Sequence, residues 1–260
     1  TDLVGALTRD RPPSALTVGE FTHFAPWSVL ADDPLYDAML LMLRHRIHRV
    51  LVRDGGQVVG ILGQMDLMGF MANHSHLISA EVAQAATVAD LARSAGQIEG
   101  LIRVLQDDGV RIEIIAGLVG GLNRQIFARL WDLLAPEALR ANSCLIVMGS
   151  EGRSEQIIRT DQDNALILRD GFDFPDLDRI TSAFTEALIG FGYPPCPGGI
   201  MLSRPLWCQS VTGFGAALYD WIHGSNPEGP MNLAIFLDAA VVAGDAALLG
   251  QLRDRLRRIL

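Results

Sequence analysis

Two aspartates, Asp161 and Asp163, are separated by one residue and lead into an apolar run at 165–168. If a strand begins at Asp161, alternate side chains share a face, so the carboxylates point the same way about 7 Å apart along the chain. Carboxylates in this arrangement can bind a divalent metal, and the metal can bind phosphate. Taken alone, the pair is also compatible with a solvated turn. An EF-hand loop is excluded because Leu166 occupies the position of its required glycine.

A candidate phosphate-binding turn lies about ten residues before the aspartates. The apolar run 144–148 predicts a buried strand, Gly149-Ser150 ends it, and residues 151–159 are rich in helix formers. A turn from strand to helix offers backbone N–H groups and the positive end of the helix dipole to a phosphate. Gly149 permits close approach, Ser150 adds a hydroxyl, and Arg153 lies one turn further on. Gly-Ser alone is also typical of a plain helix cap.

Composition narrows the classes of function. The formal net charge of the 260-residue chain is -9, which argues against non-specific binding to nucleic acid or to an anionic membrane. Its three cysteines form no C-x-x-C pair, and no apolar run reaches the roughly 18 residues of a membrane span. We therefore expect a reduced, cytoplasmic setting. The chain lacks an initiator Met and ends in an uncapped helical pattern, so we expect a fragment truncated at its ends.

The first 78 residues predict a small α/β module. A helix at 35–45 is followed by strands at 49–53 and 57–62, which Asp54-Gly55-Gly56 joins as a hairpin, and by a helix at 65–72. The order of these elements and the sequence HRVLVRDGGQVVGILGQMDL resemble a CBS motif, a module that works in pairs and often binds adenine nucleotides. Residues 1–3 look like the tail of a preceding repeat, so the pair is expected to be truncated.

The resemblance leaves the ligand of this module open. In CBS motifs a Ser or Thr three residues before a closing Asp helps to bind ribose and phosphate. Asp66 matches that Asp, but Gly63 stands at the Ser or Thr position. Either an adenine nucleotide binds at Asp66, or the module has a structural or homodimerising role. His74 and His76 form an H-x-H that could bind metal, although two ligands without a third are more often a loop.

Residues 79–140 predict a helical connector that packs on the following domain. Apolar spacing favours helices at 82–106 and 111–134, with a turn at 107–109. Gly117, Gly120 and Gly121 could mimic a phosphate loop. No G-x-x-x-x-G-K-[ST] is present, however, so close helix packing explains them better.

The run GSEGRSEQIIRTDQDNALI resembles the nucleotidyltransferase signature of the DNA polymerase β-like superfamily. More narrowly, it resembles the bacterial DUF294 nucleotidyltransferases, which are akin to protein-PII uridylyltransferases and commonly follow CBS pairs. The likeness continues through Gly192-Tyr193-Pro194, Cys196-Pro197-Gly198-Gly199, Met201, Trp207, Trp221 and Gly244-Asp245. Gly198-Gly199 could line an acceptor or base pocket, or form a surface turn. Trp207 and Trp221 favour packing over base stacking.

This resemblance implies an α/β (α+β) fold with a nucleotidyltransferase-type mixed sheet at 141–260 and helices on one side. A third carboxylate on a later strand completes the metal site in the superfamily, and Asp238, in an expected strand at 233–238, is the matching residue. Asp161, Asp163 and Asp238 would then bind two Mg²⁺ ions, while Gly149, Ser150 and Arg153 position the triphosphate of ATP or UTP. The acceptor hydroxyl would belong to a protein tyrosine or to a small molecule.

Two alternatives to an enzyme remain. Relatives usually read Asp-x-Arg where this chain has Asp238-Ala239-Ala240. Ala240 and Gly63 favour a non-catalytic sensor, in which the fold binds nucleotide or a partner for signal transduction and the CBS module acts as the switch. The intact set of aspartates favours the enzyme. A purely structural adaptor would bind no nucleotide.

Overall fold

The computed structural model describes residues 17–21, 25–107, 110–156 and 160–259. The chain divides into two compact units, Thr1–Phe70 and Met71–Leu260. The boundary falls within helix α3 (Gln64–Gln84). The tail of a preceding CBS repeat, expected at residues 1–3, lies outside the described residues. The division at residues 78 and 140 stays a prediction.

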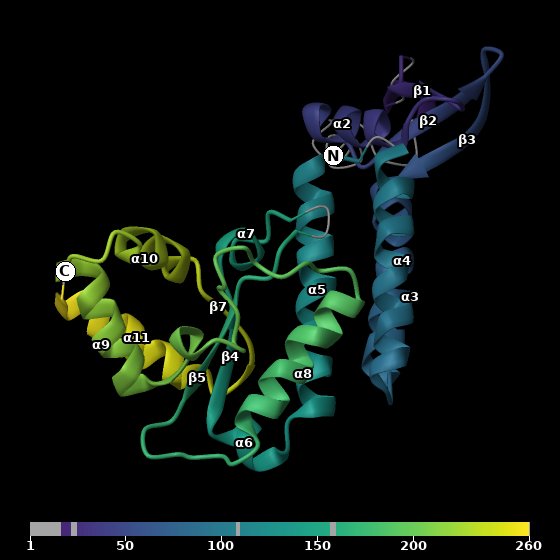
Figure 1. Cartoon of the computed structure of the whole chain (residues 1–260). Helices are drawn as coiled ribbons and strands as arrows, with labels where there is room; N and C mark the ends of the chain where they lie inside the picture. Colours follow the sequence, from purple (N-terminus) through teal and green to yellow (C-terminus); the bar gives the residue numbers. More distant parts are fainter. Residues whose placement is uncertain (1–16, 22–24, 108–109, 157–159, 260) are drawn as a thin grey trace. The chain divides into compact units, whose positions relative to one another are not determined.

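The first unit is a three-stranded sheet with a helix packed on it (Figure 1). After η2 (Val18–Phe21), the order is β1 (Ser28–Leu30), α2 (Leu35–His45), β2 (Arg49–Asp54), β3 (Gln57–Gly63) and the start of α3. Strand β1 is parallel to β2, and β2 is antiparallel to β3. Apolar side chains from α2, β2 and α3 form its core: Ala38, Met42, Val50 and Leu67. The helix predicted at 35–45 and the hairpin are confirmed, whereas the helix predicted at 65–72 is wrong at its end, because α3 continues to Gln84.

The second unit begins with long helices whose boundaries were only partly predicted. Helix α3 ends at Gln84, α4 spans Val88–Asp107 and α5 spans Ile112–Leu134. The uninterrupted helix expected at 82–106 is wrong at its start, because Thr87 and Asp90 form a capping box. The Asp90 carboxylate accepts from the Thr87 N–H at 2.8 Å, and the Thr87 hydroxyl accepts from the Asp90 N–H at 3.2 Å.

A four-stranded mixed sheet follows the helices. The remaining elements are, in order, α6 (Glu137–Ala141), β4 (Ser143–Val147), α7 (Gly149–Gly152), β5 (Asn164–Leu168), α8 (Leu177–Gly190), η3 (Pro205–Trp207), β6 (Cys208–Ser210), α9 (Val211–His223), α10 (Gly229–Leu237), β7 (Ala240–Gly244) and α11 (Ala246–Ile259). The strand order is β6-β5-β4-β7, with β4 antiparallel to both β5 and β7 and β5 parallel to β6. The expected mixed sheet is confirmed.

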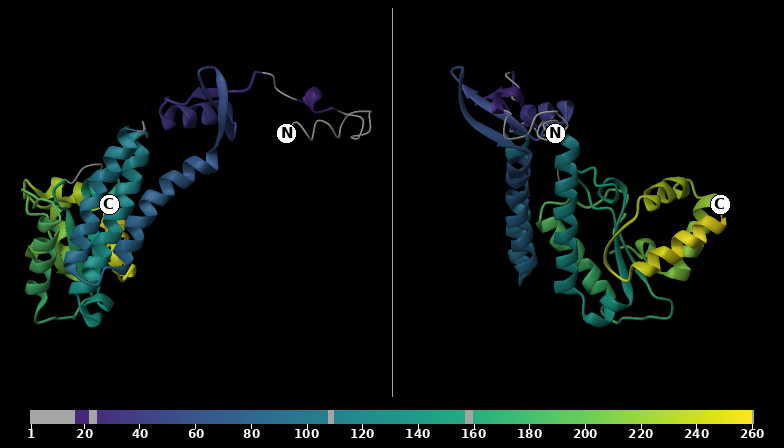
Figure 2. Two further views of the ribbon diagram at one scale, coloured as in Figure 1. Left: turned by 90° about the vertical axis from the view of Figure 1, so that its right-hand side faces the viewer. Right: turned by 180° about the vertical axis from the view of Figure 1, so that it is seen from behind.

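Helices cover both faces of this sheet, so the expectation of helices on one side is wrong. Leu145 and Val147 of β4 pack into a core with α5 and α8, whereas Cys144 and Ile146 pack into a second core with α9, α10 and α11. Figure 1 shows the two helical layers, and the view from behind in Figure 2 shows them again. The physical reason is visible in the sequence, because β4 and β5 are continuous apolar runs, as expected for strands buried on both faces.

The predicted strand at 233–238 is also wrong. These residues belong to α10, which ends at Leu237, and the next strand, β7, begins only at Ala240. A short apolar run does not by itself distinguish a buried strand from a helix. Pro230 in the first helical turn is the local signal for a helix start. Trp207 and Trp221 are buried with ring centroids 5.4 Å apart, which confirms their predicted packing role.

Candidate functional site

The two aspartates of the Asp-x-Asp motif come together with a cysteine. One ligand atom from each of Asp161, Asp163 and Cys196 lies within 4.8 Å of the others. The strand itself begins at Asn164, but the Asp163 carbonyl accepts from the Met148 N–H at 2.8 Å and extends the β4–β5 ladder by one residue. The two carboxylates therefore share a side, as the alternation predicts.

Gln162, between the aspartates, and Asn164, directly after them, face the opposite way and anchor the segment. The Gln162 side-chain amide donates to the Tyr193 carbonyl at 3.0 Å. The Asn164 side-chain carbonyl accepts from the Leu202 N–H at 2.9 Å. Both side chains are buried. Amide side chains on one face thus fix the register that places Asp161 and Asp163 on the other.

Asp163 is the group whose environment most favours a cation. Its Oδ1 is buried without a hydrogen-bond partner. Burial raises the pKa of Asp163, the charge of Asp161 raises it further, and a hydrogen bond with the Cys196 thiol lowers it. An uncompensated buried carboxylate oxygen beside a second carboxylate is a suitable ligand set for a hard divalent cation.

Cys196 fits the role of hydrogen-bond partner better than that of metal ligand. Burial raises the pKa of its thiol, and so does the bond to Asp163. A protonated sulfur is a poor ligand for Mg²⁺, which prefers oxygen. The donor set thus fits a single oxygen-bound cation at Asp161 and Asp163.

The Gly149 turn contacts this carboxylate directly. Gly149 has a φ of 55°, a left-handed conformation that favours glycine, and a Cβ added to it would lie 2.7 Å from Asp163 Oδ2. The N–H groups of Gly149, Ser150 and Glu151 make no hydrogen bond with the described part of the chain. Backbone donors therefore lie unpaired beside the candidate metal ligands.

The helix expected at 151–159 is wrong where the structure describes it. Helix α7 is one turn long and ends at Gly152, while residues 157–159 lie outside the described segments. A single turn has few aligned peptide dipoles, so the dipole contribution expected for a longer helix is small. What the turn offers a phosphate is its N–H groups and the nearby side chains.

Ser150 and Arg153 lie on or next to this turn, and both have partners. The Ser150 hydroxyl accepts from the Gln156 side-chain amide at 3.2 Å. Arg153 donates to Glu155 at 2.8 Å and forms a short ion pair with Asp238. The bond to Glu155 has the larger effect and the bond to Asp238 the next, and both raise the pKa of the Arg153 guanidinium.

Asp238 approaches the turn but does not join the two other aspartates. Its carboxylate pairs with Arg153 and is not part of the Asp161, Asp163 and Cys196 group. Its backbone carbonyl lies so close to Gly152 that a Cβ there would be 2.1 Å away. The Gly152 position thus packs α7 directly on the end of α10.

A buried polar network beneath the turn was not predicted. The Tyr193 hydroxyl donates to Asn123 at 2.6 Å, and Asn123 donates to Glu151 at 3.3 Å. Burial raises the pKa of Glu151 to about 7, while Asn123 and then Arg124 lower it, and its Oε1 has no partner. Asn123 is a polar residue on the buried face of α5, which is the one signal of this network that the sequence carried.

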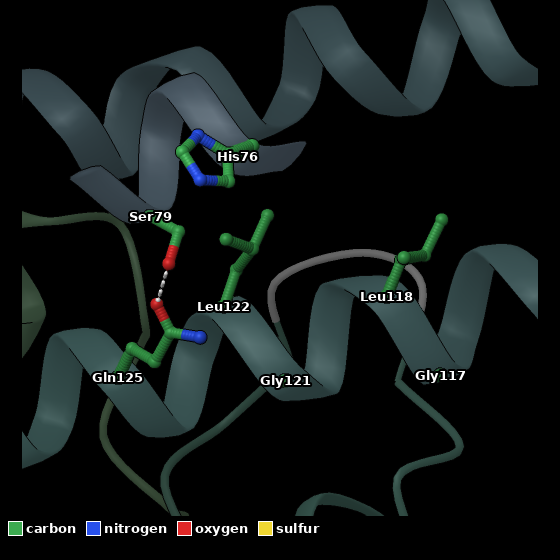
Figure 3. Close-up of a pocket in the computed structure, with 7 residues that line it drawn as sticks. All are labelled: His76, Ser79, Gly117, Leu118, Gly121, Leu122 and Gln125. Atoms are coloured by element: carbon green, nitrogen blue, oxygen red, sulfur yellow. Dashed lines mark hydrogen bonds between the residues drawn. The ribbon is translucent and has the colours of Figure 1, made fainter. Parts of the chain in front are cut away.

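The three glycines of α5 have different roles. Gly120 packs closely on Ser154, with 3.1 Å between its added Cβ and the serine Cβ, as close packing predicts. Gly117 and Gly121 instead open onto a hollow of about 330 Å³ between α3 and α5 (Figure 3). There the Ser79 hydroxyl bonds Gln125 at 2.5 Å. The hollow has a mainly apolar lining that includes His76 and no carboxylate, so it offers little for phosphate or metal chemistry.

In the first unit, Asp66 has a structural partner. Its carboxylate accepts from the Gly63 N–H at 2.8 Å and caps the start of α3. Gly63 contributes no hydroxyl at the position where the CBS resemblance expects one. His76 is exposed, and the side chain of His74 lies outside what the structure describes. No metal cluster that includes either histidine is found among the described residues.

Residues 96–228 match the family described as "Putative nucleotidyltransferase DUF294", over more than half of the chain. The chain belongs to this family. The DUF294 match includes the Gly149 turn, Asp161, Asp163 and Cys196, but it ends before Asp238 and Ala240. Residues 18–73 match a CBS domain, so the two modules occur in the order that the sequence predicts.

A comparison with curated proteins found no match. Among the described residues, the longer helices are too short or too polar to cross a membrane. The DUF294 assignment rests on the family match.

Proposed function

We propose that this DUF294 protein is a Mg²⁺-dependent nucleotidyltransferase that transfers a nucleoside monophosphate from ATP or UTP to a hydroxyl group. The observation that carries the proposal is the contact between Gly149 and Asp163. It joins unpaired backbone donors to a carboxylate whose Oδ1 is buried and unpartnered, with Asp161 beside it. Phosphate and metal ligands are thus adjacent, as phosphoryl transfer requires.

Hydrogen-bond donors and cationic groups have one role in this proposal, and carboxylates have another. The N–H groups of the Gly149 turn, the Ser150 hydroxyl and the Arg153 guanidinium bind the β- and γ-phosphates. Asp161 and Asp163 hold the cation, which when bound neutralises phosphate oxygens and the leaving pyrophosphate.

Arg153 and Asp238 form an exchangeable pair in this proposal. Phosphates that bind at the turn compete for Arg153 and free the Asp238 carboxylate, which would then be available as a third metal ligand. Asp238→Asn distinguishes the two roles. If Asp238 only restrains Arg153, the variant binds ATP more tightly without Mg²⁺; if it also ligates metal, Mg²⁺-dependent affinity falls.

Calorimetric titration with ATP and UTP, with and without Mg²⁺, tests the site. We expect Mg²⁺ to strengthen nucleotide binding, and Asp163→Asn to abolish that gain. Asp173→Asn is the matched control, because Asp173 is exposed and lies on a loop away from the turn. Metal-dependent binding that survives Asp161→Ala with Asp163→Ala would overturn the proposal.

A non-catalytic nucleotide sensor is the second candidate, and the ion pair of Arg153 with Asp238 favours it. Both side chains are engaged with each other rather than open to substrate. Release of pyrophosphate from labelled ATP or UTP, assayed with protein and small-molecule acceptors, separates the candidates. Binding without pyrophosphate release across all acceptors would support the sensor.

The CBS domain is proposed to regulate this site and to form a homodimer. Apolar side chains of β3 are exposed within the first unit, among them Val59 at 59% and Ile61 at 63%. Exposed apolar strand residues are typical of an interaction surface. An adenine nucleotide is the proposed regulator. Its binding is read out as a shift in melting temperature, which we expect Asp66→Ala to reduce.

A further inference from the structure

A second hollow of about 320 Å³ lies between α8 and the loop that follows Cys196. Helix α8 contributes Ser182, Thr185 and Glu186, whose spacing of three and four residues places them on one helix face. The loop contributes Ser203 and Arg204. The volume suits a small molecule rather than a peptide segment.

The polar groups of this hollow lack partners within the protein. Among the described residues, the side chains of Ser182, Glu186, Ser203 and Arg204 make no hydrogen bond or ion pair. Thr185 is only 7% exposed, yet its hydroxyl has no hydrogen-bond partner. Leaving a buried hydroxyl unpaired costs about 1–3 kcal/mol, so Thr185 favours a polar ligand, and the more exposed Ser182, Glu186, Ser203 and Arg204 are free to bind the same ligand.

The hollow adjoins the candidate metal ligands through the backbone. Pro195, which lines it, pairs with Gln162 in an isolated β-bridge. The Gln162 side chain also donates to the Thr185 carbonyl at 3.3 Å. The neighbouring residues, Cys196 and Asp163, are joined by a hydrogen bond from thiol to carboxylate. On each of these two segments, the residue at the hollow (Pro195 or Gln162) is thus one position, roughly 3.3 Å of chain, from the residue at the candidate metal site (Cys196 or Asp163).

The position of the hollow relative to the Gly149 turn indicates which of the two substrates, nucleotide or acceptor, it suits. In-line transfer places the attacking and leaving oxygens on opposite sides of the phosphorus. The Gly149 turn contacts Asp163 on one side and would hold the leaving pyrophosphate there. The other neighbour of Asp163 is Cys196, which begins the loop of the hollow. The attacking hydroxyl is therefore expected on the side of the hollow.

We propose that this hollow binds the acceptor, a small hydroxylated molecule that carries one anionic group, such as a sugar or polyol phosphate. Arg204 binds the anion, while Glu186 and the hydroxyls of Ser182, Thr185 and Ser203 bind its hydroxyl groups. This assignment rests on the proposed nucleotidyl transfer. The acceptor oxygen forms a bond to the α-phosphorus, the bond to the bridging oxygen breaks, pyrophosphate leaves with the electron pair, and the hydroxyl proton passes to water.

Binding is measured first without nucleotide, so that it does not depend on catalysis. The full chain is titrated with glycerol 3-phosphate, ribose 5-phosphate and glucose 6-phosphate, and with the three uncharged parent compounds. We expect at least one phosphate to bind, and its parent to bind at least about tenfold more weakly because it lacks the charge for Arg204.

Two variants locate the bound molecule. Arg204→Gln is expected to weaken binding about tenfold or more, and Glu186→Gln several-fold, with melting temperatures unchanged. Arg179→Gln is the matched control, since Arg179 is an exposed arginine of α8 that does not line the hollow. Turnover assays should show a raised KM for the acceptor and an unchanged KM for the nucleotide.

The outcomes separate this inference from the proposed function. Absence of binding by all three phosphates, or binding that survives both variants, overturns the acceptor site. Loss of ATP or UTP affinity in Arg204→Gln would assign the hollow to the nucleotide and also overturn it. Phosphate binding without Mg²⁺-dependent nucleotide binding would instead contradict the proposed function, while the hollow remained a ligand site.

Discussion

Gly149 combines two constraints at one residue, and its replacement tests both. Gly149→Ala puts a Cβ at a positive φ and within 2.7 Å of Asp163 Oδ2. We expect the free energy of unfolding to fall by about 1–3 kcal/mol, because a left-handed backbone is unfavourable for alanine and the carboxylate must move. Chemical denaturation measures the first effect. Titration with ATP and Mg²⁺ measures the loss of nucleotide binding.

Gly250→Ala provides the control for this substitution. Gly250 lies in α11, and an added Cβ would meet nothing within 4 Å. Alanine favours helix over glycine by up to about 1 kcal/mol, so this variant should be at least as stable as the parent and bind nucleotide equally. Equal stability of the two variants would contradict the close approach of Gly149 to Asp163.

Glu151 makes stability depend on pH. Because its pKa rises from 4.5 to about 7, the folded chain binds the Glu151 proton more tightly than the unfolded chain does. The free energy of unfolding therefore has a contribution that is complete below pH 4.5 and is lost as pH rises towards 7, on the order of 3 kcal/mol.

Glu151→Gln should remove this dependence. Denaturation curves at several pH values are expected to show a shallower fall in stability for the variant between about pH 5 and 7. Glu137→Gln, at an exposed position of α6, should retain the parent slope. A variant slope equal to that of the parent would mean that Glu151 ionises in the folded chain as it does in the unfolded chain.

At the scale of elements, β4 carries side chains into two cores. Leu145 and Ile146 are both fully buried, one on each face of the sheet. We expect Leu145→Ala and Ile146→Ala each to lower the free energy of unfolding by about 2–5 kcal/mol. Val104→Ala, at a half-exposed position of α4, should change it by less than about 1 kcal/mol. A small effect at either strand position would indicate helices on one face only.

The sequence predicted the elements whose signals are local. The CBS-type hairpin has turn glycines between two apolar, β-branched runs, and the expected bounds of this hairpin and of α2 were close to those observed. The paired aspartates also came together as alternation predicts. The α10 segment was mistaken for a strand because its apolar run lacks a distinguishing period, which placed Asp238 on the wrong kind of element.

Contacts between segments that are distant along the chain could not be predicted from the sequence pattern. The loop at Cys196 reaches Asp163 and Asn123 reaches Glu151 through tertiary packing, and no spacing rule connects residues so far apart along the chain. The same holds for the pairing of Arg153 with Asp238. The Gly149 turn, the Asp-x-Asp pair and the family were predictable, whereas the partners that set their charge were not.

At the scale of the whole molecule, the exposed strand of the CBS unit predicts self-association. If Val59 and Ile61 lie at a homodimer interface, Ile61→Glu should convert a dimer of the 28.2 kDa chain to monomer. Light scattering coupled to gel filtration measures the mass. Val104→Glu, an apolar-to-acidic change at another exposed site, should leave it unchanged. A parent protein that is already monomeric would rule out this interface.

The alternation between Asp161 and Asn164 has a consequence for how this chain tolerates mutation. Carboxylates and amides occupy alternate positions: Asp161 and Asp163 face the candidate metal site, while Gln162 and Asn164 form hydrogen bonds on the opposite side. Inserting or deleting a single codon within this segment would exchange the two pairs, sending acids towards the Tyr193 core and amides towards the turn. Point substitutions in this segment should reduce function by varying amounts, whereas single-residue insertions or deletions should abolish it and be lost by selection. Related chains are therefore expected to differ in length outside this segment.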